Sequence, residues 1–239
     1  GPNQYWSTVD ALSLNRLEVV RGPGSVLYGS DAVGGTVNAV STGRTGYGDG
    51  FDWDRRLFYR YSSAERSHIG RFEVSGQTDA VLGFHGGVSV KDFGDLEGGE
   101  EVGRQRRTGY DELDWDAKLE YFLTPGARLV YGHQTVNLDD AWRAHSTIYG
   151  YSWAGTTVGS DQRRLFDQGR DLDYLQFHAE NLEGFVEEVH FNLSHHFQDE
   201  MEDRVRANGT RQTQTVDVHT LGLTAQCQSS TAIGRWIYG

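Results

Sequence analysis

From about residue 51 onward, the chain alternates between apolar and polar side chains over long stretches. Between residues 113 and 121 the odd positions are Leu, Trp, Ala, Leu and Tyr, and the even positions are Asp, Asp, Lys and Glu. Residues 175–180 and 189–196 alternate in the same way. Successive side chains of a strand point to opposite faces, so this period of two predicts β-strands. Stretches of roughly 10 to 13 residues are longer than usual strands and suit a membrane-spanning barrel.

The breaks in this pattern predict nine strands, with short and long connections between them. The strands are expected near residues 54–62, 67–77, 80–91, 110–122, 127–137, 171–181, 185–198, 214–226 and 232 onward. Tight turns at 78–79, 124–126 and 182–184 alternate with long polar segments at about 92–109, 138–170 and 199–213, apart from a brief first connection at 63–66. Outer-membrane barrels have this rhythm, because their turns are short on one side and their loops long on the other. The alternative from a different class of protein is a soluble β-sandwich binding domain, in which the same apolar faces of the strands would form the core.

Residues 1–42 have a different texture, which predicts a separate domain. Residues 14–21 alternate and carry β-branched side chains, and Gly22-Pro23-Gly24 ends that strand with turn chemistry. A turn or short helical piece is expected at 25–29, and a second strand at 36–40. Four glycines between residues 43 and 50 predict a linker. The expected organisation is therefore 1–42, a linker at 43–50, and the long strands of 51–239.

Composition narrows the function classes. The chain has 22 Lys and Arg against 34 Asp and Glu, a net charge of −12, which argues against nucleic acid as a partner. Cys227 is the single cysteine, so a disulfide framework and a cysteine zinc site are excluded. No apolar run approaches the roughly 18 residues of a membrane helix. The chain starts with Gly rather than Met and stops in what reads as a strand, so we expect a piece of a longer protein.

Residues 14–41 carry a dense motif: Leu14-Asn15-Arg16-Leu17-Glu18-Val19-Val20-Arg21-Gly22-Pro23-Gly24-Ser25-Val26-Leu27-Tyr28-Gly29-Ser30-Asp31-Ala32-Val33-Gly34-Gly35-Thr36-Val37-Asn38-Ala39-Val40-Ser41. It closely resembles the end of the plug domain of TonB-dependent receptors, with Leu17 in place of the usual isoleucine. The residues that carry the resemblance most clearly are Gly22, Pro23, Tyr28, Gly29, Gly34, Gly35 and Asn38. Independently of the family, the glycines mark sharp turns or positive φ, and Pro23 stiffens the first turn.

The resemblance implies the fold class and the function. It implies an all-β membrane protein, in which a partial transmembrane antiparallel β-barrel of about nine strands is preceded by the end of a small α+β plug domain. A complete barrel of about 22 strands is too wide for side chains to fill, and the plug closes it. Such receptors lie in the outer membrane of Gram-negative bacteria and import a scarce ligand. A TonB-type energy-coupling complex of the inner membrane pulls on a segment at the start of the plug, which this sequence lacks. The family also implies that charged plug residues pair with residues of the barrel wall, and Glu18 and Arg21 are the residues expected in that role. The alternative is that Glu18 and Arg21 pair with each other or with water.

A ferric siderophore is the expected ligand, with haem or cobalamin as alternatives within the family. The segment 138–170 is the candidate ligand loop, because aromatic rings and arginine suit a catecholate siderophore through stacking and charge. Its candidate residues are Trp142, His145, Tyr149, Tyr151, Trp153 and Arg163. The alternative is that these rings pack against one another within the loop.

The sequence gives less support to a metal-binding protein, an enzyme or a passive porin. His195 and His196 are adjacent in a strand and point to opposite faces, whereas His178, His190 and His196 should line a polar lumen. We therefore expect no metal site, no resident cofactor and no catalytic residues. The sequence contains no H-E-x-x-H, P-loop or G-x-S-x-G motif, which argues against an enzyme. A passive porin would not carry the plug segment.

Overall fold

The computed structural model describes residues 8–25, 32–42, 50–78 and 81–239, and nearly all of this part is β-structure. A short 3-10 helix, η2 (Ala11–Ser13), leads into a hairpin of β1 (Leu14–Arg21) and β2 (Gly35–Ser41). The remaining strands form one antiparallel sheet of nine, in which each strand pairs with its neighbours in sequence. They are β3 (Asp52–Ser62), β4 (Ser67–Thr78), β5 (Leu82–Phe93), β6 (Tyr110–Thr124), β7 (Ala127–Trp142), β8 (Arg163–Ala179), β9 (Glu188–Val205), β10 (Arg211–Thr231) and β11 (Gly234–Tyr238). A second 3-10 turn, η3 (Ala144–Ser146), lies between β7 and β8.

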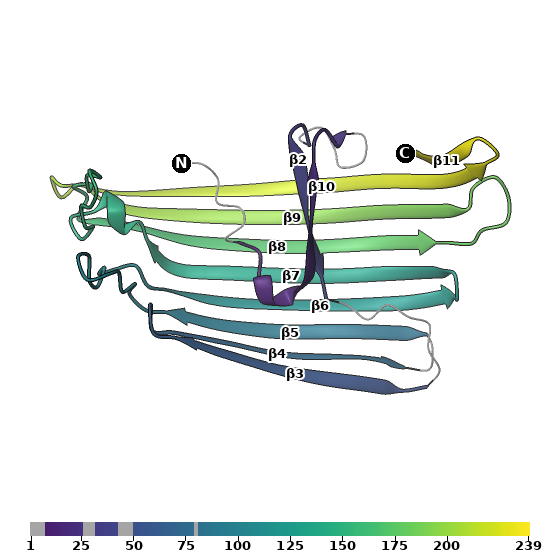
Figure 1. Ribbon diagram of the computed structural model, residues 1–239, viewed down its shortest axis with the longest axis horizontal. Coiled ribbons are helices and arrows are strands. Elements are labelled where there is room, and N and C mark those ends of the chain that lie inside the picture. Colours follow the sequence, from purple (N-terminus) through teal and green to yellow (C-terminus); the bar gives the residue numbers. More distant parts are fainter. Residues whose placement is uncertain (1–7, 26–31, 43–49, 79–80) are drawn as a thin grey trace.

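The large sheet is polar on the face that lies against the hairpin and apolar on the other. The hairpin crosses the strands of this sheet rather than running along them (Figure 1). Charged side chains such as Arg71, Lys91 and Asp114 are buried, whereas Leu119, Leu175 and Leu223 on the other face are exposed. This distribution is the reverse of that of a water-soluble sandwich, whose apolar face is buried. It is the arrangement of a barrel wall with its polar face toward the lumen and its apolar face toward lipid.

The strands are longer than the alternation predicted at the end that carries the long loops. β8 begins at Arg163 rather than near residue 171, and β9 and β10 together extend over most of the expected loop at 199–213, leaving a turn at 206–210. The registers of β8, β9 and β10 continue without a break through this region. Here polar residues occupy both faces, so the period of two disappears from the sequence while the hydrogen-bond ladder continues. Among the described residues, no helix is both long enough and apolar enough to cross a membrane.

Two glycines of the motif shape the hairpin. Gly22 has φ +102° and follows β1, where the chain must turn. Gly35 has φ +155°, and a Cβ placed there would lie 2.8 Å from the carbonyl oxygen of Val20 on the paired strand. Both positions therefore require glycine for backbone reasons. Tyr28, Gly29 and the expected linker up to residue 49 lie outside the described residues, so the boundary between the two parts stays a prediction.

Candidate functional site: the plug contact and the outer loops

Asp10 is the residue through which the segment before β1 contacts the inner face of the large sheet. Its side chain is 4% exposed and caps η2 by accepting a hydrogen bond from the Leu12 amide at 3.0 Å. The other carboxylate contacts come from the sheet: Lys91 Nζ lies 2.9 Å from Oδ1, and the Ser89 hydroxyl donates to Oδ2 at 2.7 Å. Arg71 Nη1 lies 3.3 Å from the same Oδ2. One buried carboxylate thus joins the hairpin segment to strands β4 and β5.

The charge on Asp10 is stabilised where it lies. Burial by itself would raise the pKa of this carboxyl, but the positive charge of Lys91 and hydrogen bonds from Lys91, Ser89 and the Leu12 amide outweigh burial. The pKa of Asp10 is therefore held below its ordinary value. A carboxylate that accepts several charge-assisted hydrogen bonds remains ionised even when it is buried. The contact is an ionic one at neutral pH.

Arg71 reaches across β5 because Gly87 leaves room for it. From β4 its Nε contacts Glu73 at 2.9 Å, and its Nη2 contacts Asp116 of β6 at 2.7 Å. Gly87 lies between, paired with Glu73 on one side and with Asp116 on the other. A Cβ at Gly87 would meet Nη2 of Arg71 at 2.2 Å. The glycine is thus a gap in the row of inward-facing side chains, through which one guanidinium connects three strands.

Lys91 holds three carboxylates, and the whole cluster is rich in negative charge. Besides Asp10, its ammonium contacts Glu112 at 2.5 Å and Asp114 at 2.7 Å. The cluster contains five carboxylates, which are Asp10, Glu73, Glu112, Asp114 and Asp116. Its fixed cations are Arg71 and Lys91, with Arg56 reaching Glu73 from the exposed side. His85 completes the cluster at 3.1 Å from Asp116. Because carboxylates outnumber cations here, losing one cation should destabilise the cluster more than losing any one carboxylate.

A second contact connects the same segment to the sheet further along. The Arg170 guanidinium of β8 donates to the Thr8 carbonyl oxygen at 3.4 Å and to Gln134 Oε1 of β7 at 3.4 Å. Its Nε lies 3.1 Å from His196 Nε2 of β9. Residues 8–13 are therefore held at two places, on β4 and β5 through Asp10 and on β8 through the contact of Arg170 with Thr8.

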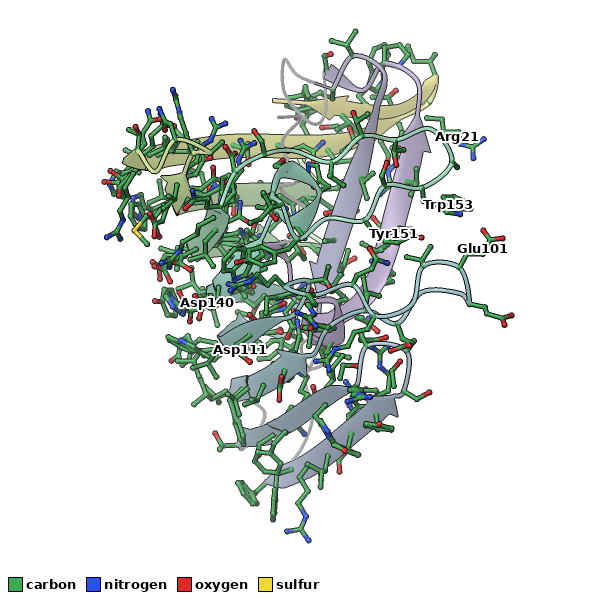
Figure 2. All side chains as sticks on the ribbon, turned by 90° about the vertical axis from the view of Figure 1, so that its left-hand side faces the viewer. Arg21, Glu101, Asp111, Asp140, Tyr151 and Trp153 are labelled. Carbon is green, nitrogen blue, oxygen red and sulfur yellow. The ribbon has the colours of Figure 1, made fainter. Side chains whose placement is uncertain are left out.

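The loops between β5 and β6 and between β7 and β8 contact one another at the opposite end from the tight turns. Tyr151 donates its hydroxyl to the Glu101 carbonyl oxygen at 2.8 Å, and the Trp153 indole N–H donates to the Glu101 carboxylate at 3.2 Å. Figure 2 shows Glu101, Tyr151 and Trp153 on the side of the sheet where the hairpin lies, with Asp111 and Asp140 on the other side. Tyr151 is 50% exposed and Trp153 56% exposed, so both rings are accessible.

The other aromatic rings of this loop are engaged within the protein. The Arg107 guanidinium lies between two rings, 4.1 Å from the Trp142 centroid and 4.3 Å from the Tyr149 centroid. These two rings also meet edge to face at 6.1 Å. His145 lies in η3, where its carbonyl oxygen accepts from the Gly159 amide, and Arg163 pairs with Asp203 of β9 at 3.1 Å. Of the six predicted ligand residues, three have side-chain contacts within the protein, Trp142, Tyr149 and Arg163, and three are exposed, His145, Tyr151 and Trp153.

Glu18 and Arg21 lie apart from the Asp10 cluster. Glu18 accepts hydrogen bonds from Arg16 at 2.7 Å and from Asn38 of β2 at 3.1 Å, both within the hairpin. Arg21 is exposed at the end of β1, next to the turn that Gly22, Pro23 and Gly34 border (Figure 2). A contact of Glu18 or Arg21 with barrel wall beyond these nine strands stays a prediction. Sequence reasoning did not single out Asp10. The available signal was Arg71 and Lys91, two cations on the polar faces of neighbouring predicted strands.

Comparison with known proteins agrees with both parts of the chain. Residues 1–36 match the family described as TonB-dependent Receptor Plug Domain. The FrpB iron transporter from Neisseria meningitidis superposes on 94% of this chain with a TM-score of 0.76 at 18% identity. The copper transporter OprC superposes on 97% with a TM-score of 0.77 at 14% identity. The ferric enterobactin receptor PfeA from Pseudomonas aeruginosa, solved as a mutant in complex with enterobactin, superposes on 92% with a TM-score of 0.62 at 16% identity.

The chain spans about one third of the length of these structures, with 36%, 33% and 34% of them covered. Likeness at these identities concerns the fold, and it confirms that the nine-stranded sheet corresponds to part of a receptor barrel. Proteins of the matched family are transporters, not enzymes, and sit in the outer membrane of Gram-negative bacteria, as the sequence predicted. Residues 1–36 thus match the plug domain of TonB-dependent receptors, and the nine-stranded sheet has the fold of part of the barrel of such receptors.

Proposed function

We propose that the receptor to which this chain belongs imports a ferric siderophore of the catecholate type, driven by a TonB-type energy-coupling complex. The observation that carries the proposal is the pair of accessible rings, Tyr151 and Trp153, held by Glu101 on the lumen side of the wall. Among the similar structures, one is called an iron transporter and another contains enterobactin. These names support iron as the cargo class, and the rings support the kind of chelate.

The two rings suit a flat, anionic iron chelate. Offset stacking of aromatic rings contributes about 0.5–1.5 kcal/mol per pair beyond the buried area. The loop that carries Glu101 also contains three arginines, of which Arg104 pairs with Asp95 at 3.2 Å and Arg107 lies over the Trp142 and Tyr149 rings. Glu101 accepts from both Tyr151 and Trp153, so the pair is held in place before a ligand arrives. Preorganised rings lose little conformational freedom on binding, which favours affinity.

The plug contact supports energy-coupled release. Asp10 and the Thr8 carbonyl tie the segment before β1 to three strands of the wall, β4, β5 and β8. A ligand bound at the outer loops can pass only when the plug rearranges, and these contacts must then break or shift. We therefore assign Arg71, Lys91 and Arg170 to holding the plug in the closed state.

The test is a titration of the full-length receptor with ferric enterobactin, in which binding is monitored by tryptophan fluorescence. Replacing both Tyr151 and Trp153 by alanine should raise Kd by about tenfold or more, as expected for the loss of two stacking contacts. Trp236→Ala is the matched control, because Trp236 is also about half exposed but lies in β11 at the turn end of the sheet. Uptake of radiolabelled iron by iron-limited cells should fall in parallel. If the wild-type receptor does not bind ferric enterobactin, or if the double variant binds it like wild type, the proposal is wrong.

A further inference from the structure

His178 of β8 and His190 of β9 form a pair on the lumen face of the sheet. They are direct partners in the strand register, and their Nδ1 atoms lie 2.7 Å apart. The rings meet nearly edge to face, with an interplanar angle of 75°. Both line a cavity of about 520 Å³ whose wall also includes Ser25, from the plug turn after β1. The pair is therefore open to the lumen on the side where the plug lies.

The outer nitrogen of each ring faces an acceptor. His178 Nε2 lies 3.3 Å from Oε1 of Gln176, and His190 Nε2 lies 3.7 Å from Oε2 of Glu188. With the protons of both rings on Nε2, the two Nδ1 lone pairs are free and face one space; with one proton on Nδ1, an N–H···N hydrogen bond joins the rings. In the first tautomer both lone pairs are available to a single cation. A metal-binding histidine commonly directs its second ring nitrogen at a carboxylate or amide oxygen in the same way.

We propose that His178 and His190 together bind a divalent transition-metal ion, with Cu²⁺ preferred, through their Nδ1 atoms. Two nitrogens about 2.0–2.1 Å from one ion and about 90° apart are themselves separated by about 2.9 Å, close to the observed spacing. Imidazole suits copper, nickel and zinc, and copper binds most tightly in the divalent series. The adjoining cavity leaves room for water or for a small chelator to supply the remaining ligands.

This is an open site rather than a closed cage. Among the described residues there is no cluster of three or more His, Cys, Asp or Glu arranged to hold a metal, so this part of the chain contributes two imidazoles. The neighbouring fixed cation, Arg128 of β7, faces His178 in the register but lies 3.9 Å from Glu120, which offsets part of its charge. Such a site binds an ion reversibly on the lumen wall and does not depend on which ligand the outer loops take.

The chain contains a matched control on its other face. His195 of β9 and His219 of β10 are also on neighbouring strands, but there Nε2 of one ring faces Nδ1 of the other at 3.1 Å. One N–H···N hydrogen bond joins the two rings there, and the nitrogens that meet are Nε2 and Nδ1 rather than two Nδ1 atoms. The rings are stacked, at an interplanar angle of 11°. Removing this outer pair should leave the proposed site intact.

The experiment is titration of the full-length receptor, stripped with a chelator and kept in detergent, with Cu²⁺ alone. Calorimetry should show one binding event that becomes at least tenfold weaker in His190→Gln, which keeps a hydrogen-bonding side chain in the lumen, and in His178→Gln. The electron paramagnetic resonance spectrum should change from two coordinated nitrogens to one in either variant. Gln176→Leu should weaken binding about 10- to 100-fold, as for other outer partners of metal-bound histidine, and His219→Gln should change nothing. If His190→Gln keeps the wild-type affinity and spectrum, or if the wild type binds no Cu²⁺, the pair holds only a shared proton and the proposal is wrong.

Discussion

Replacing Lys91 should loosen the plug far more than replacing Asp10, although the two residues form the same ion pair. Lys91→Met keeps an unbranched side chain one atom shorter but leaves Asp10, Glu112 and Asp114 without the ammonium that contacts all three. Removing one partner of a buried pair costs about 3–5 kcal/mol, because the remaining charge is left uncompensated. Asp10→Asn keeps the shape of the side chain and removes one of five carboxylates from an over-acidic cluster. It loses charge-assisted hydrogen bonds but relieves repulsion, so we expect a net cost below about 2 kcal/mol.

Hydrogen exchange in the full-length receptor measures this difference at the plug itself. The Leu12 amide donates to the Asp10 side chain and the Ser13 amide to the Asp10 carbonyl, so their protection reports on the contact. At pH 7.5, Lys91→Met should lower the opening free energy of both amides by more than Asp10→Asn does. The loss should be smaller at pH 5, because a carboxylate left without its cation can take up a proton. Equal effects of the two substitutions, or a larger effect of Asp10→Asn, would refute the charge accounting.

Three further outcomes follow from the same structure. Gly87→Ala should displace the Arg71 guanidinium and destabilise the receptor by about 1–3 kcal/mol in urea unfolding. Gly86→Ala should have little effect, because its Cβ would lie at an ordinary van der Waals distance, 3.7 Å, from the Asp116 carbonyl oxygen. The pKa of Asp10 in the folded protein is lower than its ordinary value of 3.8, so the ionic contact of Asp10 should be complete above pH 3.8. The contact should be lost as the pH falls through the lowered pKa, and the measurement is loss of Leu12 amide protection only below about pH 3.8. Leu223→Arg on the apolar face should cost about 2–4 kcal/mol when the receptor is refolded into lipid vesicles, while Thr224→Arg on the lumen face should cost much less; similar costs for both would contradict the orientation of the wall.

The arrangement of the candidate site could be foreseen only in part. The alternation in β4, β5 and β6 places Arg71, Lys91 and Asp114 on a polar face, and the sequence alone supports that much. Which acid of the plug would meet them could not be deduced, because Asp10 precedes the motif and is 61 residues from Arg71. The loop rings show the same limit. Their clustering was evident in the sequence, but only the fold places Arg107 between Trp142 and Tyr149 and leaves Tyr151 and Trp153 accessible.

The sequence by itself determined the class of the protein. Period-two alternation requires strands with two unlike faces, and the glycine-rich motif of residues 14–41 requires sharp backbone turns, because these are local properties of neighbouring residues. The tertiary structure decided how far the strands extend at the end that carries the long loops. There the hydrogen bonds between strands continue although apolar and polar side chains no longer alternate. It also decided every long-range pair: Asp10 with Lys91, Glu101 with Trp153, and the facing nitrogens of His178 and His190. Such pairs depend on strand register and on how the plug crosses the wall, and no local signal in the chain encodes either.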